Sequence, residues 1–493
     1  MAVADALGQD SPLATLALYA SLITAISYIA YRTYFDPLSH VPGPLICRLT
    51  SLWVWIHSYL GDECRQIDSL HAKYGPVVRI APNEVVFSEG EALGPIYSEK
   101  GGFLKSPAYA NFDFEGHQTI FSARDPAHRA KRSKAVVPMF STAAIRSNVD
   151  TIEGCIDQFV KRLQSEVAKA RSRAKETGNS HPVDVLNLTR GLALDAVTSY
   201  LFGKSYDGCN EKTSRLSASM FVDSVVSFGR FFYLPNYLFG HVFTICQKLF
   251  PPSPEENESI EKVDTFTKPL THNPPFENLY QTRLLNSGIT PEETNIQMQD
   301  VIFAGTNTTG TNLALLLWNL TNHPSVLQKL HQELHEASTT DPSTLPYLNA
   351  TIKETLRLSM ANPTRFPRIV PPSGWTYTSP STSKTYHLPS GTQVGLQPWT
   401  LHFNPSVFPD PHTFNPDRWL DPTKEMLRDW IPFNIGARQC IARNLAMTEL
   451  LLTARAAVKE GVLRGARVVR GKIEVVEWFN AKIVGKKVEL VWD

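Results

Sequence analysis

The spacing of apolar residues predicts helices through most of the chain. Between residues 150 and 177, apolar side chains recur every three or four positions, at Ile152, Ile156, Phe159, Val160, Leu163 and Val167. Residues at this spacing share one face of an α-helix, so the stretch predicts an amphipathic helix. Gly178 follows it and is typical of a helix end.

A second, longer helix is predicted from Thr290 to about Asn322. Thr290, Pro291 and Glu293 are typical of an N-cap, a first-turn proline and a capping-box acid. At about 1.5 Å per residue, such a helix is about 45 Å long and crosses a whole domain. Its middle, AGTNTTG at residues 304–310, consists of poor helix formers. Two interpretations are open, a kink bridged by water or a polar notch beside a cofactor.

Short β-prone runs lie near both ends of the chain. Residues 76–89, PVVRIAPNEVVFSE, predict a hairpin broken at Pro82 and Asn83, and about the last 25 residues predict strands. Residues 251–278 are polar and rich in proline, which predicts a surface loop. No repeat or linker divides the chain after residue 50. We therefore expect one large domain that is mainly α with small β-sheets.

The N-terminus predicts a membrane anchor. Residues 11–31 contain no charge over 21 positions, about the length of one bilayer-spanning helix. Arg32 follows the run and acidic residues precede it, which places the basic side in the cytosol. A cleaved signal peptide is the alternative, but no basic segment precedes the run. We expect an anchor at residues 1–35, a Pro/Gly-rich hinge at 36–50 and a cytosolic catalytic domain at 51–493.

Overall charge and cysteine content argue against two classes of protein, those that attract nucleic acid by net charge and disulfide-bonded secreted domains. The 493 residues include 48 basic and 47 acidic side chains, so no global field attracts nucleic acid. The six cysteines show no framework spacing. This pattern is typical of reduced thiols in the cytosol rather than of a disulfide-bonded secreted domain.

Cys440 lies between a glycine-containing loop and an amphipathic helix, in the segment WIPFNIGARQCIARNLAMTELLLTARAAV at residues 430–458. A helix N-terminus offers N–H donors and positive potential, which keep a thiolate deprotonated. Gly436 permits a tight loop before the helix, and Phe433 is placed to shield the sulfur. Taken alone, a single cysteine in this position is more often a small buried apolar residue.

The segment FNIGARQCIA resembles the haem-binding loop of the cytochrome P-450 family, F-x-x-G-x-R-x-C-x-G. Phe433, Gly436, Arg438 and Cys440 are in register, and Ala442 replaces the final glycine. The resemblance implies a P-450-type domain in which Cys440 binds the iron of heme b as an axial thiolate. It also implies electrons from NADPH through a separate reductase, since the chain contains no flavin or iron–sulfur motif.

Two further motifs are similar to those of the family. KETLR supplies Glu354 and Arg357 one helical turn apart, a pair that alone is usually solvated and weak. In the family this pair forms a buried triad with a later arginine, which FNPDRW supplies as Arg418. The resemblance therefore implies a structural triad of Glu354, Arg357 and Arg418.

The central AGTNTT resembles the family motif A-G-x-D/E-T-T and places Thr308 at the oxygen-activating threonine. Asn307 stands where the family has an acid, and an amide cannot shuttle a proton as a carboxylate does. Either Thr308 and an ordered water deliver protons, or delivery is altered in favour of desaturation, coupling or rearrangement. Ordinary oxygenation is the favoured interpretation.

The resemblance also implies contacts to the haem propionates. DPAHRAKRSKAVVPMFS, residues 125–141, resembles the helix that crosses the haem edge. His128 and Arg132 occupy its propionate-binding positions, and Arg368 in FPRIVP and His402 in LHFNP match further contacts. The basic run at 128–134, with Arg438 and Arg443, is a candidate surface for an acidic reductase, although a solvated helix face explains many of these charges.

The predicted substrate pocket combines several apolar segments with Val301, Phe303 and Ala304 of the central helix. An apolar lining favours a lipophilic small molecule. The resemblance is to microsomal, fungal members of secondary metabolism, which implies the endoplasmic reticulum membrane and terpenoid, polyketide or alkaloid intermediates. Two other hypotheses stay open: a haem-thiolate enzyme that inserts no oxygen, and a non-catalytic haem sensor or carrier.

Overall fold

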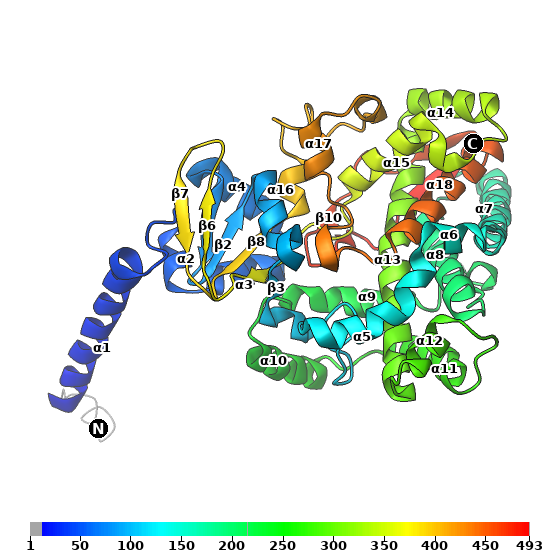
Figure 1. The fold of residues 1–493 in the computed structure, drawn as a ribbon. Helices are drawn as coiled ribbons and strands as arrows, with labels where there is room; N and C mark the ends of the chain where they lie inside the picture. The colour runs from blue at the N-terminus through cyan, green and yellow to red at the C-terminus, as the bar shows by residue number, and fades with distance from the viewer. Residues whose placement is uncertain (1–11, 214, 493) are drawn as a thin grey trace, which may run out of the picture.

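The computed structural model describes residues 12–213 and 215–492. A large helical part is crossed by the long helix α13 (Pro291–Asn322), and a smaller part contains most strands of the largest sheet (Figure 1). The predicted fold class, mainly α with small β-sheets, is confirmed. The C-terminal strands are confirmed as well, with β12 (Glu489–Trp492) paired to both β4 (Val183–Asp184) and β9 (Ala466–Val468).

Helix α13 begins at the predicted residue. The Thr290 side chain accepts a hydrogen bond from the Glu293 N–H at 3.3 Å, which satisfies one of the first free donors of the helix. The Glu293 carboxylate binds Arg132 of α5 (Pro126–Val136) instead of completing a capping box. The helix continues through residues 304–310 without interruption.

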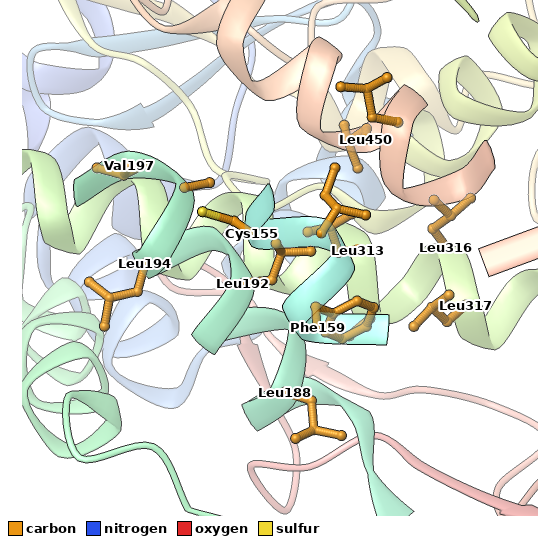
Figure 2. Packing of buried hydrophobic residues seen from close by; sticks show 14 of the residues in the cluster. Cys155, Phe159, Leu188, Leu192, Leu194, Val197, Leu313, Leu316, Leu317 and Leu450 are labelled. Carbon is orange, nitrogen blue, oxygen red and sulfur yellow. The ribbon is translucent and has the colours of Figure 1, made fainter. Parts of the chain in front are cut away.

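Three other helices form the main core with α13: α8 (Val185–Phe202) and α18 (Arg443–Lys459) pack on α13, and α7 (Val149–Thr177) packs on α8 and α18. Figure 2 shows Phe159 of α7, Leu192 of α8 and Leu313 of α13 within this cluster. Each such side chain stabilises the fold by about 1.5–3 kcal/mol when fully buried. Helix α7 ends at Gly178, whose φ of +71° confirms the predicted stop.

The glycines of the 304–310 segment are contact points between α8 and α13. A Cβ on Gly305 would lie 2.6 Å from Val197 Cγ2, and one on Gly310 would lie 2.9 Å from the Arg190 Cα. Only a residue without a side chain allows two helices to approach this closely. Packing against α8 therefore explains both glycines, which the sequence alone left open.

The five-stranded sheet has the order β1-β2-β8-β5-β3. Strands β1 (Val77–Ala81) and β2 (Glu84–Phe87) form the predicted hairpin, and β2 also pairs in parallel with β8 (Gln393–Leu396). At the other edge, β3 (Leu104–Lys105) pairs with β5 (Arg368–Ile369) and sets Lys105 directly opposite Arg368. The sheet thereby places two buried cations side by side.

The predicted surface loop at residues 251–278 is wrong, because most of it forms helix α11 (Pro254–His272). Ser253 and Glu256 make a reciprocal capping box, and Pro254 occupies the first turn, where proline is tolerated. Val263, Thr267 and Leu270 form the buried stripe of this helix. The prolines that suggested a loop mark the helix start and its last turn.

The described part of the N-terminus forms helix α1 (Pro12–Ala30), followed by a π-helical segment at Tyr31–Phe35. Residues 1–11 of the predicted anchor lie outside the described residues. Within residues 12–213 and 215–492, no helix is both long enough and apolar enough to span a bilayer. The prediction of a transmembrane helix is therefore not confirmed.

The close approach of α8 to α13 predicts the effect of Gly310→Ala. Because the new methyl group meets the Arg190 backbone, we expect a loss of about 1–3 kcal/mol in the free energy of unfolding, measured by denaturant titration. The control is Gly154→Ala on α7, where the added Cβ meets nothing within 4 Å; it should gain about 0.5–1 kcal/mol. Equal stabilities for the two variants would contradict this packing argument.

Candidate functional site

A cavity of about 970 Å³ lies between α13, the loop before α18 and the edge of the five-stranded sheet. Of the residues predicted from the sequence, nine line it: Val301, Phe303, Ala304, Thr308, Arg368, His402, Phe433, Arg438 and Cys440. Phenylalanines of α9 (Ser219–Phe228) and α10 (Asn236–Leu249) also line it. The cavity therefore brings the candidate cysteine and the candidate threonine into one apolar chamber.

The loop before α18 is held by a contact that only glycine permits. Gly436 has a φ of +74°, and a Cβ there would lie 2.0 Å from the Tyr97 carbonyl oxygen. The Cys440 N–H donates to the Phe433 carbonyl at 2.9 Å, which closes the loop on itself. These two constraints fix the place at which Cys440 enters the cavity.

The surroundings of Cys440 act on its thiol in opposite directions. The side chain is exposed to the cavity, and the cavity lies deep in the protein. Burial raises the pKa of the Cys440 thiol, whereas the backbone N–H of Ala442 and the charge of Arg443 lower it. A cation bound at the sulfur would favour the thiolate further.

Four cations line the cavity without an acidic partner among the ion pairs of the described residues: Lys105, Arg129, Arg368 and Arg438. Burial, and then the neighbouring arginines, hold the pKa of Lys105 well below its usual range. The same two causes lower the pKa of Arg438 to about 10. Asp300 also lines the cavity and interacts with Lys105, but four cations that form no ion pair in the described part of the chain still favour an anionic ligand, and the two propionates of a haem fit this role.

Of the residues that the resemblance assigned to propionates, Arg132 and His402 are otherwise engaged, and His128 does not line the cavity. Arg132 is paired with Glu293 and also donates to the His128 carbonyl at 2.9 Å. Neither His128 nor Arg132 lines the cavity, although the buried Nε2 of His128 has no hydrogen-bond partner among the described residues. His402 lines the cavity, but its Nε2 accepts from the Ile431 N–H at 3.0 Å and its Nδ1 faces the Arg357 carbonyl at 3.1 Å.

The neutral His402 ring therefore links two backbone segments, at Arg357 and at Ile431, by hydrogen bonds. Because Nε2 accepts a hydrogen bond, the ring proton must be on Nδ1, where it is donated to the Arg357 carbonyl. Burial, together with the charge of Arg357, lowers the pKa of His402 to about 3. With both ring nitrogens occupied, this histidine has no free donor for a propionate.

Glu354 is the centre of a buried network. Arg357 donates to both oxygens of its carboxylate at 2.8 Å, and Arg418 donates to Oε1 at 3.1 Å. Trp419 Nε1 and the Asn415 N–H donate to the same carboxylate at 2.9 and 3.0 Å. The three predicted triad residues thus lie together, and they tie α15 (Pro346–Ser359) to the segment that leads to the Cys440 loop.

Thr308 and Asn307 differ in their surroundings. The Thr308 hydroxyl donates to the Ala304 carbonyl at 2.7 Å and lines the cavity. Asn307 is buried, does not line the cavity, and accepts a hydrogen bond from Arg190 of α8 at 3.1 Å. Only the threonine is therefore placed to contact a bound molecule directly.

Sequence reasoning missed four site residues, namely Lys105, Arg129, Trp419 and Arg190. Lys105 lies next to Arg368 because β3 pairs with β5 in this register. Each of these strands has only two residues, which is too short to give a recognisable pattern in the sequence. Arg129 is next to His128, so the predicted helix was correct but the cavity-facing residue was not singled out. Trp419 directly follows Arg418 in the quoted motif, and a buried indole N–H that needs an acceptor was the available signal.

The buried network predicts that Glu354→Gln is strongly destabilising. It removes the negative charge from two arginines that are almost fully buried, so we expect a loss of about 3–5 kcal/mol in the free energy of unfolding. Lys329→Ala is the control, since its ion pair with Asp417 is half exposed and contributes about 0–1 kcal/mol. A loss of similar size in both variants, measured by denaturant titration, would contradict a stabilising triad.

Comparison with known proteins agrees with this geometry. The family model described as "Cytochrome P-450" matches residues 41–458. The chain is 37% identical to the cytochrome P-450 monooxygenase mfmF of Annulohypoxylon moriforme, over 96% of this chain and 98% of that protein. It is 29% identical to the cytochrome P-450 monooxygenase orf2 of Aspergillus niger, over 90% of this chain and 89% of that protein. This chain therefore belongs to the cytochrome P-450 family.

Proposed function

We propose that this protein is a haem-thiolate monooxygenase that oxidises a lipophilic small molecule, with Cys440 as the iron ligand. The observation that carries the proposal is the composition of one cavity. Cys440, Thr308 and four cations that form no ion pair among the described residues all line it. A cysteine at a loop held by Gly436 supplies the axial ligand, and the cations supply partners for the propionates.

The residues present fit a haem b. Cys440 would hold the iron, and Lys105, Arg129, Arg368 and Arg438 would pair with the propionates. A bound haem with a thiolate ligand supplies the activation of molecular oxygen and the oxidation of unreactive C–H bonds. The protein supplies positioning, the exclusion of water and the control of protons around that chemistry.

Thr308 is the residue proposed to hold a proton at the reacting side of the cavity. Its hydroxyl now donates to the Ala304 carbonyl, and rotation about its side-chain bond would let the same O–H donate into the cavity. Asn307, which precedes Thr308, cannot take up a proton, so it contributes hydrogen bonding rather than acid–base chemistry. Phe433 lines the cavity together with Cys440 and is proposed to limit the access of water to the sulfur.

The substrate is proposed to be apolar with at least one polar group. Phe303, Phe221 and Phe228 are among the phenylalanines of the lining, and Val301 and Ala304 complete the surface next to Thr308. Asp300 also lines the cavity on α13; burial raises its pKa to about 6, against the lowering effects of Thr119 and Lys105. A carboxyl group in this position favours a substrate with a hydroxyl or another donor.

Electrons are proposed to come from an NADPH–cytochrome P-450 reductase that binds the face carrying α5. Arg132 and Arg438 are engaged in internal contacts, which leaves Lys131, Lys134 and Arg443 as the exposed charges of the predicted surface. Exposed cations that face an acidic partner accelerate association and make it dependent on ionic strength. No nucleic-acid partner is proposed, because the net charge is only +1.

Attachment to the endoplasmic reticulum membrane is proposed from the uncharged run at residues 11–31. Leu16, Leu22 and Ile23 of α1 are exposed in the structure. Exposed apolar side chains that lie close together are typical of a surface that contacts lipid or another protein. A role in secondary metabolism, on a terpenoid, polyketide or alkaloid intermediate, is proposed from the sequence resemblance to fungal members of the family.

A second candidate function is oxidation without net oxygen insertion. Asn307 in place of an acid favours it, because altered proton delivery favours desaturation, coupling or rearrangement. A third hypothesis, from another class, is a haem sensor or carrier without turnover. The cavity-facing Thr308 argues against it, because a carrier has no use for a hydroxyl at that position.

Turnover under labelled oxygen separates these functions. The full chain, combined with a purified fungal reductase and NADPH under ¹⁸O₂, is offered a panel of terpenoid and polyketide intermediates. We expect a product that carries one labelled oxygen atom, detected by mass spectrometry. An unlabelled, dehydrogenated or coupled product would support the second function. No NADPH consumption above that of the reductase alone, with any compound, would contradict an enzyme and favour the carrier.

A further inference from the structure

Arg190 forms a buried bridge between three helices. From α8, its Nη2 donates to Asn307 Oδ1 on α13 at 3.1 Å, and its Nη1 donates to Asp223 Oδ1 on α9 at 3.1 Å. All three residues are buried. The other oxygen of Asp223 lies 3.4 Å from Lys486 Nζ, which is half exposed, so the bridge runs from the centre of α13 to the surface.

The guanidinium fixes the direction in which the Asn307 amide faces. A guanidinium only donates hydrogen bonds, so Oδ1 must face Arg190 and Nδ2 must face away from it. The Nδ2 group also only donates. Residue 307 can therefore hold an acceptor, such as a water oxygen, in a defined place, but it cannot carry a proton.

Asp223 supplies the negative charge that position 307 lacks. A buried arginine without a counter-ion is strongly destabilising. In the family motif, the carboxylate stands on the long central helix, at the position of Asn307. In this chain the carboxylate that faces Arg190 comes from α9, on the other side of the same guanidinium.

Helix α9 is also a wall of the cavity. Phe221, Ser224 and Phe228 of this helix line it, and Asp223 adjoins Ser224 in the same helix. The bridge thus connects a wall of the substrate chamber to the residue beside Thr308. Gly310 lets the backbone of Arg190 lie against α13, so the bridge has little freedom to shift.

We propose that Arg190 and Asp223 are positioning residues for Asn307, and that the carboxylate of the oxygen-activation site has moved from α13 to α9. The inference rests on the proposed haem-dependent function. The fixed amide keeps the hydrogen bonds around Thr308 in a productive arrangement. When the arrangement is lost, O₂ takes two electrons from NADPH and two protons from water and leaves as hydrogen peroxide, without oxidising a substrate.

A charge-relocation series tests the bridge itself. The variants are Asp223→Asn, Asn307→Asp and the double variant, which returns the carboxylate to α13. We expect Asp223→Asn to lower the Tm of the purified full chain by about 3–5 °C, because Arg190 loses its counter-ion. The double variant should regain at least half of that loss. A double variant no more stable than Asp223→Asn would overturn the bridge, whether or not the protein is an oxygenase.

The share of NADPH electrons released as hydrogen peroxide tests the positioning role. Asp264→Asn is the matched control, because Asp264 of α11 also accepts from α13 amides, Asn295 at 2.9 Å and Gln299 at 3.0 Å. Every variant is first required to show the wild-type CO spectrum. We expect the peroxide share to rise about threefold or more in Asp223→Asn, since small misplacements of positioned groups change rates by larger factors, and to stay near wild type in Asp264→Asn.

Equal peroxide shares in Asp223→Asn and Asp264→Asn would show that the bridge only stabilises the fold, and the positioning role would be overturned. A wild-type protein without a thiolate-type CO spectrum would instead contradict the proposed function. The two failures are therefore distinguishable, and the Tm series still decides the pairing of Arg190 with Asp223 and residue 307.

Discussion

The positive charge gathered at one cavity is the constraint on which the site depends. Lys105 and Arg368 face each other across two paired strands, and Arg438 and Arg129 approach from the loop before α18 and from α5. Like charges directly opposite each other destabilise a sheet unless a counter-ion lies nearby. The strands, the loop and the helix that converge here are therefore best understood as parts of an anion-binding frame around Cys440.

The remainder of the fold holds this frame in place from two sides. Glu354 accepts five hydrogen bonds, and the three from Asn415, Arg418 and Trp419 join α15 to the segment before the Cys440 loop. His402 joins the same region to Ile431. On the opposite side, Gly305 and Gly310 let α8 support α13, so that Thr308 faces the cavity from a rigid helix. Polar contacts therefore fix one side of the site, and close helix packing fixes the other.

The sequence predicted the parts of this arrangement that depend on local pattern. The Thr290 N-cap and the two ends of α13, the end of α7 at Gly178 and the β1–β2 hairpin follow from residue spacing and turn chemistry, and the structure confirms them. The haem loop and the triad were found because a family motif names their residues. The role of Gly310 and the pairing of Lys105 with Arg368 depend on contacts between distant segments, which no local pattern encodes. Helix α11 was missed because its two outer prolines resemble loop signals.

The measurement that tests the central claim most directly is the CO spectrum of the reduced, purified protein, taken beside Cys440→Ser and Cys246→Ser. Both cysteines line the cavity, so Cys246 is a control for the loss of a thiol alone. If Cys440 is the iron ligand, the wild type and Cys246→Ser show a strongly red-shifted Soret band that Cys440→Ser lacks. A red-shifted band that persists in Cys440→Ser, or a well-folded wild type with the band of histidine-ligated haem, would contradict the account.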